Sequence, residues 1–166
     1  AISLSLAAML FYIWIRFEWQ FSLGAITALV HDVIITVGIF SFLAYEVNLS
    51  IVAAVLTIVG YSMNDTVVIF DRIRENLKKY SKISITDISD MSTNQTLSRT
   101  LITSVTTLLA LLSIYIFGGA ILKGFSLAMI IGVIIGTYSS IFVATPILNY
   151  TKVSQKTILK ENLENN

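Results

Sequence analysis

The chain has 166 residues, of which 55% are hydrophobic and only 13% charged. Soluble domains carry about 25% charged residues, so this composition excludes an ordinary soluble domain and indicates a membrane protein. The chain contains no Cys and a single His, which excludes disulfides and thiolate metal sites and leaves no basis for a zinc site. Because no Ser/His/Asp arrangement with plausible spacing and no Gly-rich phosphate loop occurs, we expect no enzyme activity.

Five apolar stretches predict an all-α, polytopic transmembrane helix bundle with five spans. Each stretch approaches the roughly 20 residues that cross a bilayer core. The predicted spans cover residues 1–15, 23–45, 49–70, 97–117 and 125–148. They form a transmembrane domain over 1–149 with a cytoplasmic surface segment at 71–96, followed by a polar cytoplasmic tail at 150–166. The first stretch lacks a preceding basic residue and is followed by Arg16 and Glu18, so we expect a membrane span and not a signal peptide.

The basic residues predict the orientation of the chain in the membrane. Nine of the eleven follow the first, third or fifth stretch, whereas Lys123 lies in a loop on the other side. By the positive-inside rule the nine mark the cytoplasm, so the C-terminus is predicted to be cytoplasmic. They are Arg16, Arg72, Arg74, Lys78, Lys79, Lys82, Lys152, Lys156 and Lys160. Since topology explains them, no specific nucleic-acid binding is expected.

The second span contains two polar residues, His31 and Asp32, near the predicted centre of the bilayer. Gly24, Ala28, Asp32 and Thr36 recur at every fourth residue and therefore share one helix face. Small residues allow close helix contact, so this face is predicted to pack on a neighbour and direct Asp32 into the bundle. Two interpretations remain open for His31 and Asp32: a structural hydrogen-bonded pair, or part of a proton path.

The third span carries a carboxylate, Asp65, inside an apolar run. Ala53, Thr57, Tyr61 and Asp65 share a face, and Asp65 lies about 7 Å from the cytoplasmic edge. An ionisable group in hydrocarbon costs at least about 2.5–3.5 kcal/mol, so Asp65 is predicted to be functional and to have a partner.

The segment after the third span has an amphipathic pattern. Its apolar positions Ile73, Leu77 and Tyr80 predict a helix lying on the inner membrane surface. Ser84 and Asp87 match a capping box, which predicts that a new helix starts before the fourth span.

The entrance of the fourth span, between Asn94 and Thr107, is unusually rich in hydrogen-bonding side chains. Arg99, Thr103 and Thr107 share one face, and Arg99 lies near the predicted depth of Asp65. Arg99 could extend to lipid phosphates at the interface. The matching depth favours the other interpretation, in which Arg99 is the counter-charge of Asp65.

The fifth span follows a turn at Gly118 and Gly119 and carries a stripe of small residues on one face. The stripe consists of Gly124, Ala128, Gly132, Gly136, Ser140 and Ala144. Spacing of this kind is typical of close helix packing and is most pronounced at Gly132 and Gly136. The stripe therefore predicts a helix-packing surface and not a reactive site.

A long motif at residues 60–76, Gly-Tyr-Ser-x-Asn-Asp-Thr-Val-Val-x-Phe-Asp-Arg-Ile-Arg-Glu-Asn, resembles the SecF-type subunits of the SecD/SecF protein-export family. The segments at 16–19, 31–32, 94–100 and 117–119 share this resemblance, which spans residues 1 to about 149. The resemblance implies a membrane plan similar to that of resistance-nodulation-division transporters. Such subunits have six spans and a sizeable extracytoplasmic domain after the first, and this chain begins at what would be the second span.

The resemblance also implies a function. In this family SecD and SecF use the proton-motive force to help pull preprotein out of the translocon. The implied partners are SecD, the Sec translocon channel, the translocating preprotein and the lipid bilayer of the bacterial cytoplasmic (inner) membrane. Protons are the coupling ion and no cofactor is implied. Carried over residue by residue, the acidic member of the proton path is Asp65 and the basic one Arg99, with Asn64 and Thr66 orienting the carboxylate.

Two other functions are compatible with the residues alone. One is a proton-coupled small-molecule transporter of the same fold, which would need a cavity with more polar groups. The other is a purely structural membrane subunit, in which Asp65 and Arg99 form a static pair.

Overall fold

The computed structural model describes residues 11–15, 17–45, 48–80, 82–151 and 153. Within these residues it contains helices and no strands, so the predicted all-α fold is confirmed. The helices are α2 (Trp19–Phe42), α3 (Leu49–Lys79), α4 (Ile85–Phe117), α5 (Gly119–Ser139), a π-helical turn η1 (Ser140–Ala144) and α6 (Thr145–Tyr150). Four helical segments are long and apolar enough to span a membrane: Trp19–Phe42, Leu49–Lys79, Ile85–Phe117 and Gly119–Tyr150. Of the first predicted span only residues 11–15 are described, and they are helical.

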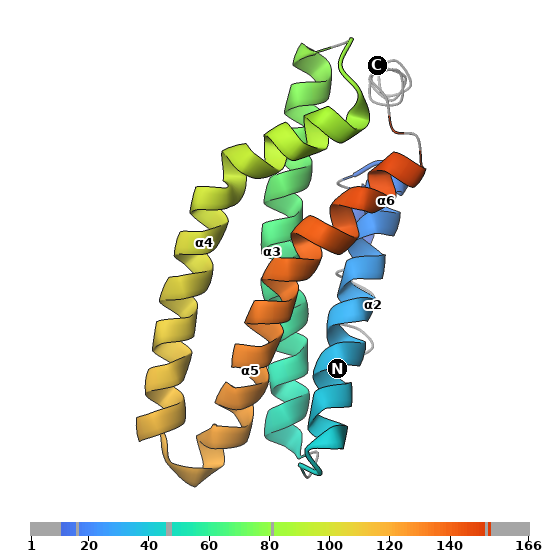
Figure 1. Cartoon of the computed structure of the whole chain (residues 1–166). Helices are drawn as coiled ribbons and strands as arrows, with labels where there is room; N and C mark the ends of the chain where they lie inside the picture. The colour runs from blue at the N-terminus through green and yellow to red at the C-terminus, as the bar shows by residue number, and fades with distance from the viewer. Residues whose placement is uncertain (1–10, 16, 46–47, 81, 152, 154–166) are drawn as a thin grey trace.

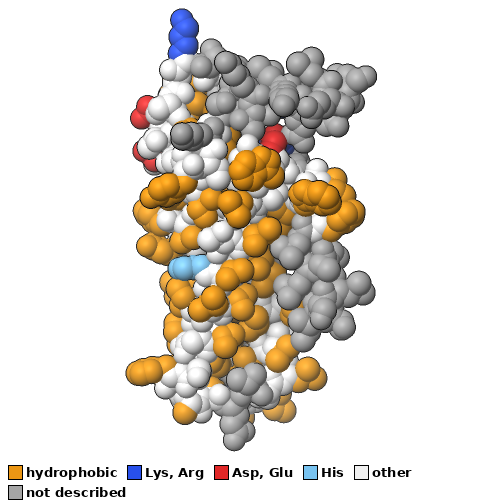
Figure 2. Space-filling view, turned by 90° about the vertical axis from the view of Figure 1, so that its right-hand side faces the viewer, with side chains coloured by type: hydrophobic (Ala, Val, Ile, Leu, Met, Phe, Trp, Pro, Cys, Tyr) orange, Lys and Arg blue, Asp and Glu red, His pale blue; other side chains and the backbone are white. Residues whose placement is uncertain are grey.

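The long helices run side by side, and α2, α3, α4 and the α5–α6 segment alternate in direction (Figure 1). The end of α3, the start of α4 and the end of α6 therefore lie together, and we call this the charged end. On the face in Figure 2 the described acidic and basic side chains lie towards this end, whereas many hydrophobic side chains and one histidine lie over the described remainder. The predicted basic residues Arg16, Lys152, Lys156 and Lys160 and the tail after residue 153 lie outside the described residues.

Helix α2 begins at Trp19, four residues before the predicted span, and ends at Phe42. Helix α3 begins after Asn48, whose side-chain oxygen accepts a hydrogen bond from the Ile51 amide at 3.1 Å. This side chain satisfies one of the amides that the first turn of a helix leaves without a partner. The connection between the two helices is short, so they form an antiparallel hairpin.

Helix α3 continues without a break through residues 71–79, where a separate surface helix was predicted. Ile69, Ile73 and Leu77 lie at four-residue spacing, and all three are buried in one hydrophobic cluster. The amphipathic pattern of this segment therefore reflects burial against the protein and not against a membrane surface. Packing of this face stabilises α3 as one long helix.

Helix α4 begins where the capping box predicted. The Ser84 hydroxyl oxygen accepts a hydrogen bond from the Asp87 amide at 3.2 Å, which confirms the predicted helix start. From there α4 runs unbroken to Phe117. It is the least buried long helix: 17% of its most apolar window is buried, against 44% for α3.

The fifth predicted span begins earlier than expected and is interrupted. Gly118 ends α4, and Gly119, at φ +76°, starts α5 in a backbone conformation that suits glycine. The π-helical turn η1 separates α5 from α6 and comes directly before Pro146. Proline has no backbone N–H and its ring crowds the carbonyl four residues earlier, which explains a widened turn at this point.

Candidate functional site

Asp32 lies in the middle of α2 and is only 1% exposed. Its Oδ2 accepts a hydrogen bond from the Ser62 hydroxyl of α3 at 2.5 Å, and its Oδ1 lies 3.1 Å from His31 Nδ1. Asp32 therefore points into the helix bundle, as predicted. Both carboxylate oxygens have partners, so this buried group is satisfied within the protein.

Ser62 is also part of a network that joins α3 to the π-helical turn. Thr66 Oγ1 lies 2.9 Å from Ser140 Oγ and 3.2 Å from the Ser62 carbonyl oxygen, and its single proton can serve either contact. Ser140 donates to the Gly136 carbonyl at 2.8 Å. These bonds connect three helical segments around Ser62 without any charged side chain other than Asp32.

Small residues allow the helices around this network to approach closely. A Cβ atom at Gly24 would lie 2.9 Å from the Ala144 carbonyl oxygen, and one at Gly136 would lie 3.0 Å from Ser62 Cβ. A Cβ atom at Gly132 would overlap the Ile58 side chain. The predicted packing residues Gly24, Ala28, Gly132, Gly136 and Ser140 are all buried. Each glycine therefore fills a position where a larger residue would push two helices apart.

Asp65, on α3, is 3% exposed, and its Oδ2 has no hydrogen-bond partner. The predicted orienting residues do not bond to it: Asn64 is exposed, and Thr66 bonds to Ser62 and Ser140. Asp65 therefore differs from Asp32 in carrying a buried oxygen that nothing satisfies. Buried polar groups without partners are rare, and each calls for an explanation.

Contacts between α3 and α4 fix which residues lie level with Asp65. Tyr61 Oη donates to Thr107 Oγ1 at 3.4 Å, and Asn76 Nδ2 donates to Ser92 Oγ at 2.8 Å. The two contacts are fifteen residues apart on each helix, so one antiparallel register holds between them. By that register Asp65 lies level with Thr103.

Arg99 lies four residues, about one turn or 6 Å, from the level of Asp65, on the side of the charged end. The two residues make no ion pair within 4.0 Å, and the Arg99 side chain is exposed. Beside it on α4, the buried Thr100 hydroxyl also has no partner. The space between α3 and α4 thus contains an unpaired carboxylate oxygen, an unpaired hydroxyl and a nearby cation.

Towards the charged end, α3 and α4 are held together by polar side chains. Gln95 Oε1 accepts hydrogen bonds from Arg72 Nε at 2.6 Å and from Asn76 Nδ2 at 3.0 Å. Arg72 also forms an ion pair with Glu75 at 2.6 Å. With the contact of Tyr61, the two bonds to Gln95 join α3 to α4 on both sides of Asp65.

An ion pair that sequence reasoning missed joins the start of α2 to α3. Arg74 Nη2 lies 2.9 Å from Glu18 Oε1, with Glu18 5% exposed, and the guanidinium lies over the Phe17 ring. Both residues belong to the motifs described above, at 16–19 and 60–76. Their separation of 56 positions left no local signal of the contact.

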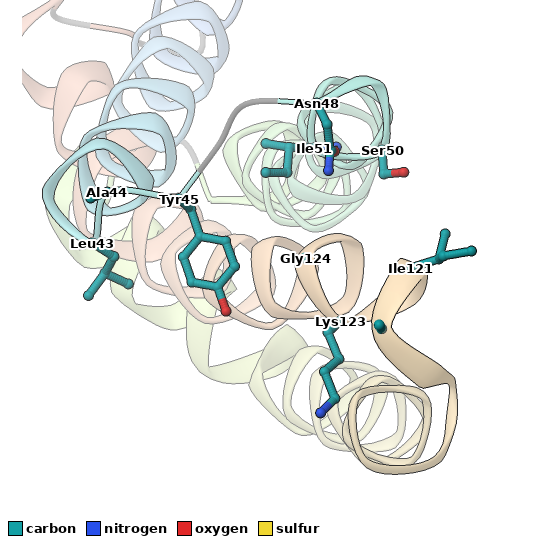
Figure 3. A pocket seen from close by; sticks show the side chains of 10 residues that line it. Leu43, Ala44, Tyr45, Asn48, Ser50, Ile51, Ile121, Lys123 and Gly124 are labelled. Atoms are coloured by element: carbon teal, nitrogen blue, oxygen red, sulfur yellow. The ribbon is translucent and has the colours of Figure 1, made fainter.

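A hollow of about 600 Å³ opens at the end opposite to the charged end. It lies between the end of α2 and the start of α5, and Figure 3 shows Tyr45 and Lys123 extending to the same side of it. Of the described residues that line it, Lys123 is the one with a charged side chain.

Comparison with known proteins places the chain among protein-export components. The sequence model of a family described as "Protein export membrane protein SecD/SecF, C-terminal" matches residues 1–154. A protein translocase subunit SecF of Rickettsia bellii is 57% identical over 148 residues, which are 89% of this chain and 49% of that protein. A SecF of Koribacter versatilis is 58% identical over 144 residues, 87% of this chain and 36% of that protein. The chain spans about half the length, or less, of these relatives.

Solved structures agree with the sequence comparison. A crystal structure of SecDF in a super-membrane-facing form has a TM-score of 0.84 and 42% identity, covering 96% of this chain and 21% of that one. A crystal structure of SecDF from Thermus thermophilus, described as a translocon-associated membrane protein, has a TM-score of 0.85 and 45% identity. It covers 89% of this chain and 20% of that one. The helical arrangement and the sequence of this chain are thus both similar to those of Sec protein-export components.

Proposed function

The chain belongs to the SecD/SecF family of protein-export membrane proteins, and we propose that it couples the proton-motive force to preprotein translocation as a SecF-type accessory subunit. Its proposed partners are SecD, the Sec translocon channel and the translocating preprotein. The proposed location is the bacterial cytoplasmic membrane, with the charged end in the cytoplasm. This orientation is supported by the basic residues of the α3–α4 connection, which the positive-inside rule assigns to the cytoplasm.

The observation that carries the proposal is the unsatisfied Asp65 carboxylate. It is buried between membrane-spanning helices, has an oxygen without a hydrogen bond, and lies one turn from Arg99. A buried carboxylate in this situation is stabilised either by taking up a proton or by pairing with a cation. Asp65 therefore has two alternative states, and a proton selects between them.

The proposed mechanism is a switch between α3 and α4. In one arrangement Asp65 is ionised and Arg99 reaches it, either by extending its side chain or by a shift of α4 of about one turn, 5.4 Å. In the other arrangement Asp65 is protonated and Arg99 faces away. Moving one charge across 100 mV supplies about 2.3 kcal/mol, enough to bias a two-state element but not to drive a large motion alone.

In this proposal Asp32 and His31 have a structural role. The Asp32 carboxylate is satisfied by Ser62 and His31, so it needs neither a proton nor a further cation. An asparagine at position 32 would still accept the Ser62 hydrogen bond through its side-chain oxygen. Asp32 therefore serves as a matched control for Asp65.

The test compares Asp65→Asn with Asp32→Asn in the full-length protein, measuring preprotein export with and without a proton-motive force. We expect Asp65→Asn to lower force-dependent export about tenfold or more, because the bias of about 2.3 kcal/mol per 100 mV is lost. Asp32→Asn is expected to retain most of the export. Unimpaired export by Asp65→Asn would remove Asp65 from the mechanism.

A second pair of variants separates a switch from a static pair. Exchanging the two charges, with Asp65→Arg and Arg99→Asp together, preserves attraction but moves the titrating group to α4. A static pair predicts that the double variant regains export lost in the single variants. The proposed switch predicts that export stays lost.

A further inference from the structure

A groove of about 680 Å³ runs between the first half of α4 and the segment formed by α5, η1 and α6. Figure 1 shows the elements that border it, with α4 on one side and the bent α5–α6 segment on the other. Its volume is within the roughly 300–1,000 Å³ of small-molecule sites. The groove is separate from Asp65 and Arg99, neither of which lines it.

The groove is polar at one end and apolar at the other. Ser89 and Asn149 line it near the charged end, whereas Leu101 and Ile134 line it deeper in the membrane-spanning part. From Ser89 to Leu101 the helix rises by about 18 Å. Half of a hydrocarbon core of about 30 Å is close to that length. The groove thus has the length and polarity of a single lipid in one leaflet.

Two buried polar atoms that line the polar end have no partner. Ser89 is 2% exposed and its Oγ makes no hydrogen bond, and the buried Oδ1 of Asn149 is also unsatisfied. Leaving such groups without partners costs about 1–3 kcal/mol each. One is a hydroxyl that can donate and the other an oxygen that can accept, so the missing partner offers both an acceptor and a donor.

The charge of the groove decides which headgroup fits. Of the described residues that line it, Asp90 is the only charged one; it is exposed and makes no ion pair with the residues that the structure describes. The Asp90 carboxylate repels an anionic headgroup and attracts an ammonium. A primary ammonium also supplies the donor that the Asn149 oxygen lacks.

We propose that this groove binds one aminophospholipid of the phosphatidylethanolamine class from the leaflet at the charged end. The ammonium lies near Asp90 and Asn149, the phosphate accepts hydrogen bonds from Ser89 and the Asn94 amide, and an acyl chain lies along Leu101 and Ile134. This site is independent of the proton switch, so either proposal can fail without the other.

The test is native mass spectrometry of the full-length protein with its partner subunits, titrated with dioleoyl phosphatidylethanolamine, phosphatidylglycerol or phosphatidylcholine. We expect phosphatidylethanolamine to be retained about fivefold over phosphatidylglycerol, the effect of one charged contact at a partly exposed site. Phosphatidylcholine, whose ammonium has no N–H, should be retained less than phosphatidylethanolamine. Equal retention of the three lipids would overturn the proposal.

Two pairs of variants assign the binding to the groove. Asp90→Asn should abolish the preference for phosphatidylethanolamine over phosphatidylglycerol. Asp87→Asn removes the same charge three residues earlier, outside the groove, and should leave the preference unchanged. A preference that survives Asp90→Asn would contradict the assignment of the headgroup.

Leu101→Trp should fill the apolar part and lower phosphatidylethanolamine retention, whereas Leu112→Trp should not. Leu101 and Leu112 are both on α4 and are similarly exposed, at 48% and 43%, but only Leu101 lines the groove. If a partner helix fills the groove instead, Leu101→Trp will weaken copurification of the partner without changing lipid retention, and the proposal is wrong.

Discussion

The two faces of α3 differ in how completely they are packed and bonded. The face towards α2 and α5 carries Ile58, Ser62 and Thr66, which meet glycines or hydrogen-bonding partners on the neighbouring helices. The face towards α4 carries Tyr61 and Asp65 and contacts a helix that is mostly exposed. On the face towards α4, Asp65 Oδ2 has no hydrogen-bond partner. Asp32 of α2, which contacts the other face, has a partner for each carboxylate oxygen.

This difference indicates which helices can move relative to each other. Glycine contacts and short hydrogen bonds hold α2, α3 and α5 in one arrangement, because any shift would separate or overlap packed atoms. Between α3 and α4 the bonds lie on either side of Asp65, and in this stretch Asp65 Oδ2 and the Thr100 hydroxyl have no hydrogen-bond partner. A carboxylate that changes its charge therefore acts where the packing resists least.

The largest expected effect concerns the face of α3 towards α2 and α5, which we call the closed face. Gly132→Ala should lower the free energy of unfolding by about 1–3 kcal/mol, because the added methyl group overlaps Ile58 and forces the helices to shift. The measurement is unfolding of the full-length protein in mixed micelles by titration with a denaturing detergent.

Gly38→Ala is the matched control, since a Cβ atom at Gly38 meets nothing within 4 Å. Alanine is the better helix former, so this variant should gain about 0.5–1 kcal/mol. If Gly132→Ala is as stable as Gly38→Ala, the face of α3 towards α5 is not closed and the comparison of the two faces fails.

Two double-mutant cycles compare the two carboxylates directly. The cycle of Asp32→Ala with Ser62→Ala should give a coupling energy of about 0.6–1.7 kcal/mol, the range for hydrogen bonds between membrane helices. The cycle of Asp65→Ala with Arg99→Ala should give less than about 0.5 kcal/mol, because the two side chains make no direct ion pair. Both cycles use the same unfolding measurement.

A coupling of Asp65 and Arg99 as large as that of Asp32 and Ser62 would contradict the comparison. It would mean that Asp65 and Arg99 are paired in the resting protein and that the face of α3 towards α4 is as fixed as the closed face. Repeating the Asp65 cycle at low pH, where the carboxyl is protonated, provides the control, since any charge coupling should then disappear.

Much of the fold was predictable because its signals are local. Four-residue spacing predicted that Gly24, Ala28 and Asp32 share a buried face, and the capping box at Ser84 predicted the start of α4. The same kind of pattern gave the wrong result for Ile73 and Leu77. An amphipathic stripe has the same spacing whether it faces a membrane surface or a protein core, so periodicity alone cannot distinguish the two.

The partners of the site residues were harder to predict than the residues themselves. The predicted depths in the membrane placed Arg99 within one turn of Asp65. The offset of one turn between them is set by the register of α3 and α4, which depends on the non-local contacts of Tyr61 and Asn76. Ser62 as the partner of Asp32 had no local signal either, because a serine at a packing position is also typical of close helix contact. Such pairs depend on how helices meet, and spacing along one helix does not encode that.

The smallest expected effect concerns the one hydrogen bond that joins α3 to α4 on the far side of Asp65. Tyr61→Phe removes the hydroxyl that donates to Thr107 at 3.4 Å, a long bond, and should cost less than about 0.6 kcal/mol. The Thr107 hydroxyl can instead donate to the carbonyl four residues earlier, so it is not left without a partner. The unfolding measurement checks the cost, with Tyr115→Phe, near the other end of α4, as the control. A loss above about 1.5 kcal/mol, the upper range for one hydrogen bond, would show that the contact of Tyr61 fixes α4 and that the face towards α4 is less open than its exposed residues indicate.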